Sequence, residues 1–511
     1  MLAVLASRDG QQAASDGKKD LSLSPSSLGP PGGGEGGHGY ADDEEKRLRD
    51  LEASTQAYVL RAQQRIRELE RYRIAAVQGT PFPHHENAPA TLNDPVAAAP
   101  APTAATEPAH PAYLGATYAV VPGRAQPTPA QLGELGRRIF FDGSLSASGQ
   151  ASCASCHDPK HAWGPPNALS VQLAGPDGRT EGPRAVPSLR YLQTLIAFTE
   201  HHHDNDGDDS IDAGPTGGHM WDGRAGSAHE QAALPLLSPA EMANASVEEV
   251  ARKLERAPYA GELRAAFGDT LFGDPQATLR AAGLALEVFQ QSPRDFYPFT
   301  SKYDAVLRGE TKLDAAEARG LALFNAEDKG NCASCHISER TPDGAFPLFS
   351  DFGQIALGVP RNRKLAANAD PDYHDMGVCG PIRTDMKDHP EYCGLFRTPS
   401  LRNVAVRQSF FHNGVFHSLE EVIRFYAQRD TAPRRWYARG KDGQVRPFDD
   451  LPAQYHANVN TDPPFGQKPG GKPALSEAEI RDVAAFLRTL TDADQHNAPD
   501  PAALRTAARQ P

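Results

Sequence analysis

Apolar residues recur at helical spacing in several segments of the chain, whereas the alternation typical of strands is sparse. This spacing predicts helices over four long segments: 245–256, 276–291, 418–429 and 476–491. In the last segment, Ser476 with Glu479 is a capping box, and one face carries Ile480, Val483, Phe486, Leu487 and Leu490. The pattern predicts a mostly α fold with long loops and little β structure.

Two further predicted helices each precede a Cys-Ala-Ser-Cys-His pentad, and the pentads begin at residues 153 and 332. The helical segments read TPAQLGELGRRIFFD and LDAAEARGLALFNAED. Each begins with a capping box: Thr128 with Gln131, and Asp314 with Glu317. Two helix-then-pentad units are typical of a duplicated module. We therefore predict two domains, over residues 113–300 and 301–495.

The flanking segments differ in composition from these domains. Residues 1–40 are rich in Gly, Ser and Pro and are predicted to be disordered, as is the tail over 496–511. Residues 41–75 are predicted to form an amphipathic helix, either solvated against the globular part or pairing two chains as a short coiled coil. Residues 76–112 are an Ala/Pro-rich linker.

Composition narrows the class of protein. The 511 residues carry a net charge of −13 and no Lys/Arg cluster of the kind that binds nucleic acid. No apolar run approaches the roughly 18 residues that a membrane helix needs. The N-terminal MLAVLASRDG has too short an apolar stretch to be a complete secretory signal.

The pentads match the pattern of c-type haem attachment. Two thiols three positions apart can bond to the two vinyl-derived carbons on one porphyrin edge, and the adjacent His then becomes the iron ligand. A redox dithiol needs no following His, and a zinc site usually has finger-like spacing between its pairs. We therefore predict two covalent haem c groups, held by Cys153, Cys156, Cys332 and Cys335, with His157 and His336 as iron ligands.

Haem c is assembled outside the cytoplasm, so we predict that the protein is periplasmic or otherwise exported, although no complete signal peptide is visible. In an oxidising compartment, the remaining pair Cys379 and Cys393 is predicted to form a disulfide. Two unpaired buried thiols are the alternative.

Residues from about 128 to 492 resemble the bacterial dihaem cytochrome c peroxidases, including the MauG-type enzymes. The segments that carry the resemblance are LGRRIFFDGSLSASGQASCASCHDP, GPRAVPSL, MWDGRAGSAHEQAALPLLSPAEM, GLALFNAEDKGNCASCH and FRTPSLRNVAVRQSFFHNGVFHSLEEVIRFY. The resemblance implies two cytochrome c-like haem domains: a first, peroxidatic one and a second that transfers electrons. It implies an oxidoreductase that reduces hydrogen peroxide with electrons from a small cytochrome c or cupredoxin.

The resemblance also assigns candidate site residues. Trp221 matches the tryptophan between the two haems, and Gln231 and Glu241 match polar residues on the open side of the first haem. A buried carboxylate suits the proton transfer that peroxide cleavage needs. Read without the family, Trp221 is a core aromatic and Glu241 a helix-start residue after Pro239.

Two departures from ordinary members point to the MauG-type enzymes. The loop SVQLAGPDGRTEGPRAVP lacks the His that ligates the first iron in those members, so an open first haem is expected. Tyr426, fourteen residues after His412, stands where ordinary members have a ligating Met. A phenolate favours oxidised iron, whereas Met sulfur raises the potential. Without the family, Tyr426 is simply part of the apolar face of the 418–429 helix.

These departures make a MauG-like oxidase the alternative function: peroxide-derived high-valent iron would oxidise a protein or another organic substrate. A non-catalytic dihaem electron carrier is less favoured, because Gln231 and Glu241 would then have no purpose. Calcium binding and a homodimer are left open. At the family calcium site Ala185 replaces the ligating Asn, and only the carbonyls of Arg407 and Ser409 remain. The inserted His201-His202-His203, followed by DNDGDDSID, offers an alternative distal ligand or calcium loop, although a solvated acidic loop is favoured.

Overall fold

A computed structural model describes residues 127–202, 213–341 and 344–496. The predicted segments over 1–40, 41–75 and 76–112, His203 and nearly all of the C-terminal tail lie outside the described residues. The helices are α2 (Pro129–Phe140), α3 (Cys153–Cys156), α4 (Ala228–Leu237), α5 (Val247–Arg256), α6 (Ala260–Phe267), α7 (Pro275–Gln290), α8 (Pro293–Phe296), α9 (Lys302–Leu307), α10 (Ala315–Asn325), α11 (Leu419–Gln428), α12 (Pro433–Trp436) and α13 (Glu477–Arg488).

The described β structure consists of two small antiparallel sheets. Strand β1 (Leu173–Ala174) pairs with β2 (Thr180–Glu181), and β3 (Gln354–Ile355) pairs with β4 (Phe396–Arg397). The prediction of a mostly α fold with long loops is therefore confirmed.

The predicted helices begin where their caps place them. The three capping boxes at Thr128, Asp314 and Ser476 are all formed. At the first, the Gln131 N–H donates to Thr128 Oγ1 at 3.2 Å, while the Thr128 N–H donates to Gln131 Oε1 at 2.8 Å. Because caps satisfy the free N–H groups of the first turn locally, sequence alone locates these helix starts.

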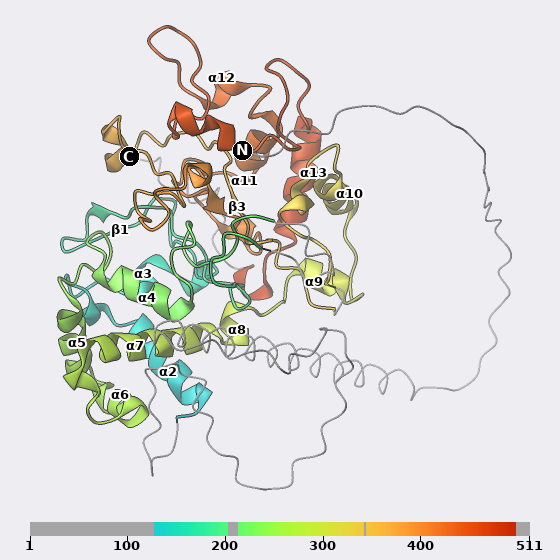
Figure 1. Cartoon of the computed structure of the whole chain (residues 1–511). Helices are drawn as coiled ribbons and strands as arrows, with labels where there is room; N and C mark the ends of the chain where they lie inside the picture. Colours follow the sequence, from blue (N-terminus) through green and yellow to red (C-terminus); the bar gives the residue numbers. More distant parts are fainter. Residues whose placement is uncertain (1–126, 203–212, 342–343, 497–511) are drawn as a thin grey trace, which may run out of the picture. The chain divides into compact units, whose positions relative to one another are not determined.

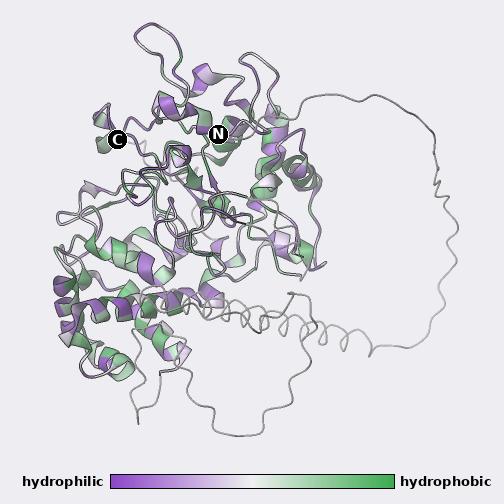
Figure 2. Cartoon of the chain, in the orientation of Figure 1, coloured by the Kyte–Doolittle hydropathy of each residue, from purple (hydrophilic) through white to green (hydrophobic). Residues whose placement is uncertain are grey.

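The described helices pack around two separate hydrophobic cores. In the first core, α2, α4 and α5 pack against α7, with Leu254, Leu263 and Ala285 fully buried. In the second core, α10 and α11 pack against α13 around buried aromatic rings such as Phe486. Figure 1 shows the two helix groups, and Figure 2 shows apolar and polar positions mixed along each helix, as expected for helices with one buried face.

A glycine makes the closest helix crossing in each core. A Cβ on Gly136 of α2 would lie 1.9 Å from the Ala285 carbonyl oxygen of α7. A Cβ on Gly320 of α10 would lie 2.0 Å from the Asp482 carbonyl oxygen of α13. In both helices a buried Phe follows the glycine by four positions: Phe140 and Phe324. Each pentad therefore follows a helix that crosses its partner in the same way, which supports the duplicated pattern.

We call the described residues up to 300 the first half and those from 301 the second half, following the predicted domain boundary, which stays a prediction. Polar contacts join the halves: Arg190 binds Asp492 at 2.9 Å and Asp494 at 2.5 Å. The Ala185 N–H donates to the His412 carbonyl at 2.7 Å. In the second half, Cys379 and Cys393 form a disulfide, as predicted. Among the described helices, none is both long and apolar enough to cross a membrane.

Candidate functional site

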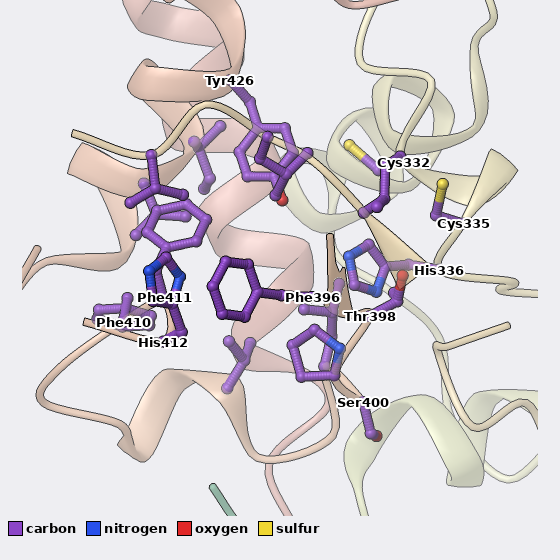
Figure 3. A pocket seen from close by; sticks show the side chains of 18 of the residues that line it. Cys332, Cys335, His336, Phe396, Thr398, Ser400, Phe410, Phe411, His412 and Tyr426 are labelled. Atoms are coloured by element: carbon purple, nitrogen blue, oxygen red, sulfur yellow. The ribbon is translucent and has the colours of Figure 1, made fainter. Parts of the chain in front are cut away.

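The second pentad lies in the wall of a largely apolar cavity. Cys332 begins a single 3₁₀ turn, and Cys335 and His336 follow it directly. Tyr426 of α11 lines the same cavity, and Figure 3 shows its hydroxyl directed toward the side of the cavity that holds Cys332 and His336. Two sulfurs, an imidazole and an apolar surround are what a porphyrin needs from its protein, so the residues fit a haem.

The imidazoles of both pentads are held in the same way. His336 Nδ1 donates to the Phe349 carbonyl at 2.8 Å, and His157 Nδ1 donates to the Trp163 carbonyl at 3.0 Å. Because a carbonyl can only accept, each Nδ1 carries the proton and each Nε2 keeps its lone pair. Burial lowers the pKa of His157 to about 4 and also lowers that of His336. Both rings are therefore neutral and have the tautomer that an iron ligand requires.

The first pentad lies beside Glu241. Its two cysteines are on the short helix α3, and Cys153 packs against the first core together with Ala232 of α4. Chiefly burial, and in addition the Glu241 carboxylate, raise the pKa of the Cys156 thiol to about 11. Burial raises the pKa of Glu241 itself, against the lowering effects of a Ser238 hydrogen bond and of Arg224. The structure thus brings Glu241 close to the first pentad as a carboxyl that retains its proton more readily than usual.

Trp221 connects the two halves. Its indole N–H donates to the Ala185 carbonyl at 2.7 Å, and its own carbonyl accepts from the Arg397 N–H at 2.7 Å. The side chain is 9% exposed and lines the cavity of the second pentad, although it belongs to the first half. Gln231 of α4 contacts the same loop, since its Nε2 lies 3.5 Å from Met220 Sδ.

Tyr426 lies on α11 and is surrounded by aromatic rings, two of them from outside this helix. Its ring centroid lies 5.4 Å from that of Phe465 and 6.1 Å from that of Phe411. Burial and then the thiols of Cys335 and Cys332 raise the pKa of the phenol well above its usual value. Burial is the largest of these causes and does not depend on the state of the two thiols. A phenolate at this position therefore needs a metal ion beside it.

Sequence reasoning missed three buried cationic or titratable side chains near Trp221. Burial and then Arg397 lower the pKa of His219, two residues before Trp221, to about 4. Burial likewise lowers the pKa of Arg397 and of Arg407 to about 10. The sequence signal was slight: Arg397 and Arg407 lie inside the segment that begins FRTPSLRNVAVRQ, and His219 directly precedes the segment that begins MWDGR.

At the candidate calcium position, an arginine side chain contacts one of the carbonyls expected to bind the ion. Arg407 Nε donates to the Ser409 carbonyl at 3.2 Å, so one of the two carbonyls expected to bind calcium already accepts from a guanidinium. Within the described ranges, no group of three or more His, Cys, Asp or Glu side chains is arranged to hold a metal ion. His201 is exposed and His202 is partly buried, while His203 lies outside the described ranges.

Each of the two helical cores carries a pentad whose neutral imidazole has the tautomer that binds iron. This arrangement defines a dihaem redox enzyme. Comparison with known proteins agrees. A family model described as di-haem cytochrome c peroxidase matches residues 130–312. The methylamine utilization protein MauG of Paracoccus denitrificans is 34% identical over 375 residues, covering 72% of this chain and 90% of that protein.

Other relatives carry peroxidase names. The cytochrome-c peroxidase IdrP1 of Pseudomonas sp. strain SCT is 29% identical over 339 residues, covering 62% of this chain and 77% of the relative. The crystal structure of the diheme peroxidase BthA from Burkholderia thailandensis is similar with a TM-score of 0.65 and 39% identity, covering 74% of this chain and 92% of that one. The chain therefore belongs to the di-haem cytochrome c peroxidase family, and it is a haem-dependent oxidoreductase of the peroxidase type.

Proposed function

We propose that this chain carries two covalent haem c groups, one at Cys153, Cys156 and His157 and the other at Cys332, Cys335 and His336. It consumes hydrogen peroxide at the first site with electrons that pass from the second. The observation that carries the proposal is the matched pair of imidazoles, each with Nδ1 bonded to a carbonyl and Nε2 left for iron. Covalent attachment requires assembly outside the cytoplasm, so the protein is periplasmic or otherwise exported.

When bound, the first haem supplies the iron at which peroxide is cleaved, and Glu241 supplies the proton transfer. A carboxyl whose pKa is raised by burial can give a proton to the leaving oxygen and take one from the other. Gln231 lies on α4, which packs into the same core as Cys153, and its amide would hold peroxide or water on that side. Together these side chains move and hold protons beside the first site.

Trp221 and Tyr426 serve the second site. The Trp221 indole lines the second cavity from the first half, so its π system is the route for electrons between the sites. Tyr426 lines the same cavity as His336 and would hold the second iron through its phenolate oxygen, a ligand that favours the oxidised state and would keep peroxide from that iron.

The peroxidase proposal is tested with the holoprotein and its Glu241→Gln variant, each supplied with a reduced small cytochrome c as electron donor. Turnover of peroxide should fall by about 10²- to 10⁴-fold in the variant, the usual range for loss of a general acid–base group. The matched control is Glu327→Gln, which removes an exposed carboxylate and should leave turnover unchanged. Equal turnover in both variants would remove Glu241 from the mechanism.

The second candidate is a MauG-like oxidase that directs the same peroxide chemistry at a protein or another organic substrate. The placement of Tyr426 in the second cavity favours it. Peroxide is added to the diferric protein without reductant, and a prompt, long-lived spectral change supports this candidate, while inertness until half-reduction supports the ordinary peroxidase. Tyr426→Met should alter the spectrum of the second haem, and an unchanged spectrum would contradict ligation by Tyr426.

The remaining parts of the proposal concern partners. The electron donor is a small cytochrome c or cupredoxin, for which the acidic chain favours a basic surface. Calcium is not part of the proposal, because Arg407 already donates to the Ser409 carbonyl.

A further inference from the structure

Four arginines line the cavity of the second pentad, and they fall into two kinds. Two of them are paired with aspartates: Arg190 binds Asp492 at 2.9 Å, and Arg402 binds Asp304 at 2.8 Å. The other two, Arg397 and Arg407, have no carboxylate within ion-pair distance in the part of the chain that the structure describes.

Arg407 makes its polar contacts with neutral carbonyls. Nε donates to the Ser409 oxygen at 3.2 Å, and Nη2 donates to the Val186 oxygen at 3.1 Å. A carbonyl accepts a hydrogen bond but brings no net charge, so the positive charge of this guanidinium is not neutralised.

Arg397 is 5% exposed, and its guanidinium has fewer hydrogen-bond partners than that of Arg407. Nε donates to the Met220 carbonyl at 3.1 Å, while the buried Nη1 has no hydrogen-bond partner among the described residues. The carboxylate of Asp222 attracts the Arg397 guanidinium electrostatically, but Asp222 already binds Arg184 and Arg224. A buried polar group left without a partner costs about 1–3 kcal/mol, and more when it is charged.

The aspartates of the same cavity are already engaged. Asp375 binds Arg184 at 2.6 Å, and Asp450 binds Arg361 at 3.1 Å. The wall therefore carries two positive charges for which the described residues provide no anion. Arginine forks are suited to carboxylates, which they bind through two parallel hydrogen bonds.

We propose that Arg397 and Arg407 bind the two propionate carboxylates of the haem in the cavity of Cys332, Cys335 and His336. This inference rests on the proposed haem at that pentad. A haem brings two carboxylates on one edge, which matches two uncompensated guanidiniums in number and charge. Figure 3 shows Phe396 and Thr398, the chain neighbours of Arg397, in the same cavity as the pentad.

The two arginines then set the redox equilibrium of the second iron. A unit charge about 10 Å from an iron, at an effective dielectric constant of about 20, changes that equilibrium by about tenfold. Removing either guanidinium leaves a propionate charge uncompensated, which stabilises the oxidised iron. Both arginines also flank Trp221. The backbone N–H of Arg397 donates to the Trp221 carbonyl, and the Arg407 guanidinium donates to the carbonyl of Val186, next to the Ala185 that accepts from the indole.

The test uses the full-length holoprotein and the variants Arg397→Gln, Arg407→Gln and Arg407→Lys. The matched control is Arg363→Gln, an exposed arginine that binds Asp449 at 2.9 Å outside this cavity. Haems per chain are counted first from the pyridine haemochrome spectrum. The ratio of oxidised to reduced second haem is then measured across a spectroelectrochemical titration, and the propionate bending band is recorded by resonance Raman spectroscopy.

At a fixed potential, each Gln variant should raise the oxidised-to-reduced ratio about tenfold, equivalent to about 59 mV for one electron. Arg407→Lys keeps the charge but not the fork, so the ratio should stay within about twofold while the Raman band moves. Arg363→Gln should change neither. If all variants hold two haems per chain and keep the wild-type oxidised-to-reduced ratio and Raman band, this inference alone is overturned. A wild-type chain without covalent haem would overturn the proposed function as well.

Discussion

The tightest helix crossing of the second core gives a quantitative test of the fold. Gly320→Ala adds one methyl group to α10 at the point where it crosses α13. The new Cβ would lie 2.0 Å from the Asp482 carbonyl oxygen, 2.7 Å from its carbonyl carbon and 2.8 Å from Phe486 Cβ. Ordinary van der Waals contact begins at 3.4 Å, so the two helices must move apart by more than 1 Å. The first two atoms are backbone inside a helix, and no side-chain rotation can make room.

The expected loss of stability follows from two opposed effects. A radial gap of about 0.5–1 Å forfeits a quarter to a half of the dispersion energy across an interface, and overpacking typically costs about 1–3 kcal/mol, occasionally more. Alanine offsets about 1 kcal/mol through its higher helix propensity. Because the obstruction is backbone and the buried Phe324 and Phe486 rings lie in the same interface, we expect the high end: a net loss of about 2–3 kcal/mol.

The assay is guanidinium-induced unfolding of the holoprotein, monitored by far-UV circular dichroism and by the Soret band. Gly261→Ala is the matched control, because Gly261 is also a helical glycine but its Cβ would meet nothing within 4 Å. That variant should gain up to about 1 kcal/mol from helix propensity alone. If Gly320→Ala behaved like Gly261→Ala, the close crossing of α10 and α13 would be wrong.

Two further changes test the second half. Replacing Cys379 and Cys393 by Ser should lower the free energy of unfolding by about 3 kcal/mol, the value for a loop of about 15 residues, whereas an equal effect of reductant on wild type and variant would contradict the bond. Asp304→Asn breaks a fully buried pair with Arg402 and should cost about 3–5 kcal/mol in chemical unfolding at pH 7. Burial by itself raises the pKa of Asp304, but Arg402 and Ser301 lower it overall. The Asp304 carboxylate therefore binds a proton more readily in the unfolded chain than in the folded one. The free energy of unfolding of the wild type falls as the pH drops below about 3.9, and the variant should lack this part of the pH dependence.

The features that could be predicted from the sequence are those fixed by local chemistry. Capping boxes begin α2, α10 and α13 at the predicted residues, because a cap involves side chains only three positions apart. The disulfide joins the two cysteines that lie outside the pentads, and each pentad is recognised from the spacing of its cysteines and histidine. The predicted helix over 476–491 ends early, at Arg488, where the N–H groups of Thr489 and Leu490 bond to carbonyls three residues back, and Leu490 joins the core from this turn.

Features that depend on the path of the loops could not be predicted. The carbonyls that hold His157 and His336 lie six and thirteen residues further along the chain, so no common spacing identifies them. Arg407 was considered only for its backbone oxygen, yet its side chain reaches the carbonyls of Ser409 and Val186. Such contacts depend on the path of the long loops and, for Val186, on the docking of the two halves, and periodicity carries no information about either.

The way in which the imidazoles and Trp221 are held has a consequence for biogenesis. Each pentad imidazole is oriented by a carbonyl of its own half, but the cavity of the second pentad is also lined by Pro187, Ser188 and Trp221 of the first half, so the second site is complete only when the two halves are docked. Trp221 differs, because its indole is anchored in the first half and its carbonyl receives Arg397 from the second. If electrons travel through Trp221 as proposed, a half-matured chain is redox-isolated. Docking of the halves is then the step that allows the second site to pass electrons to the first.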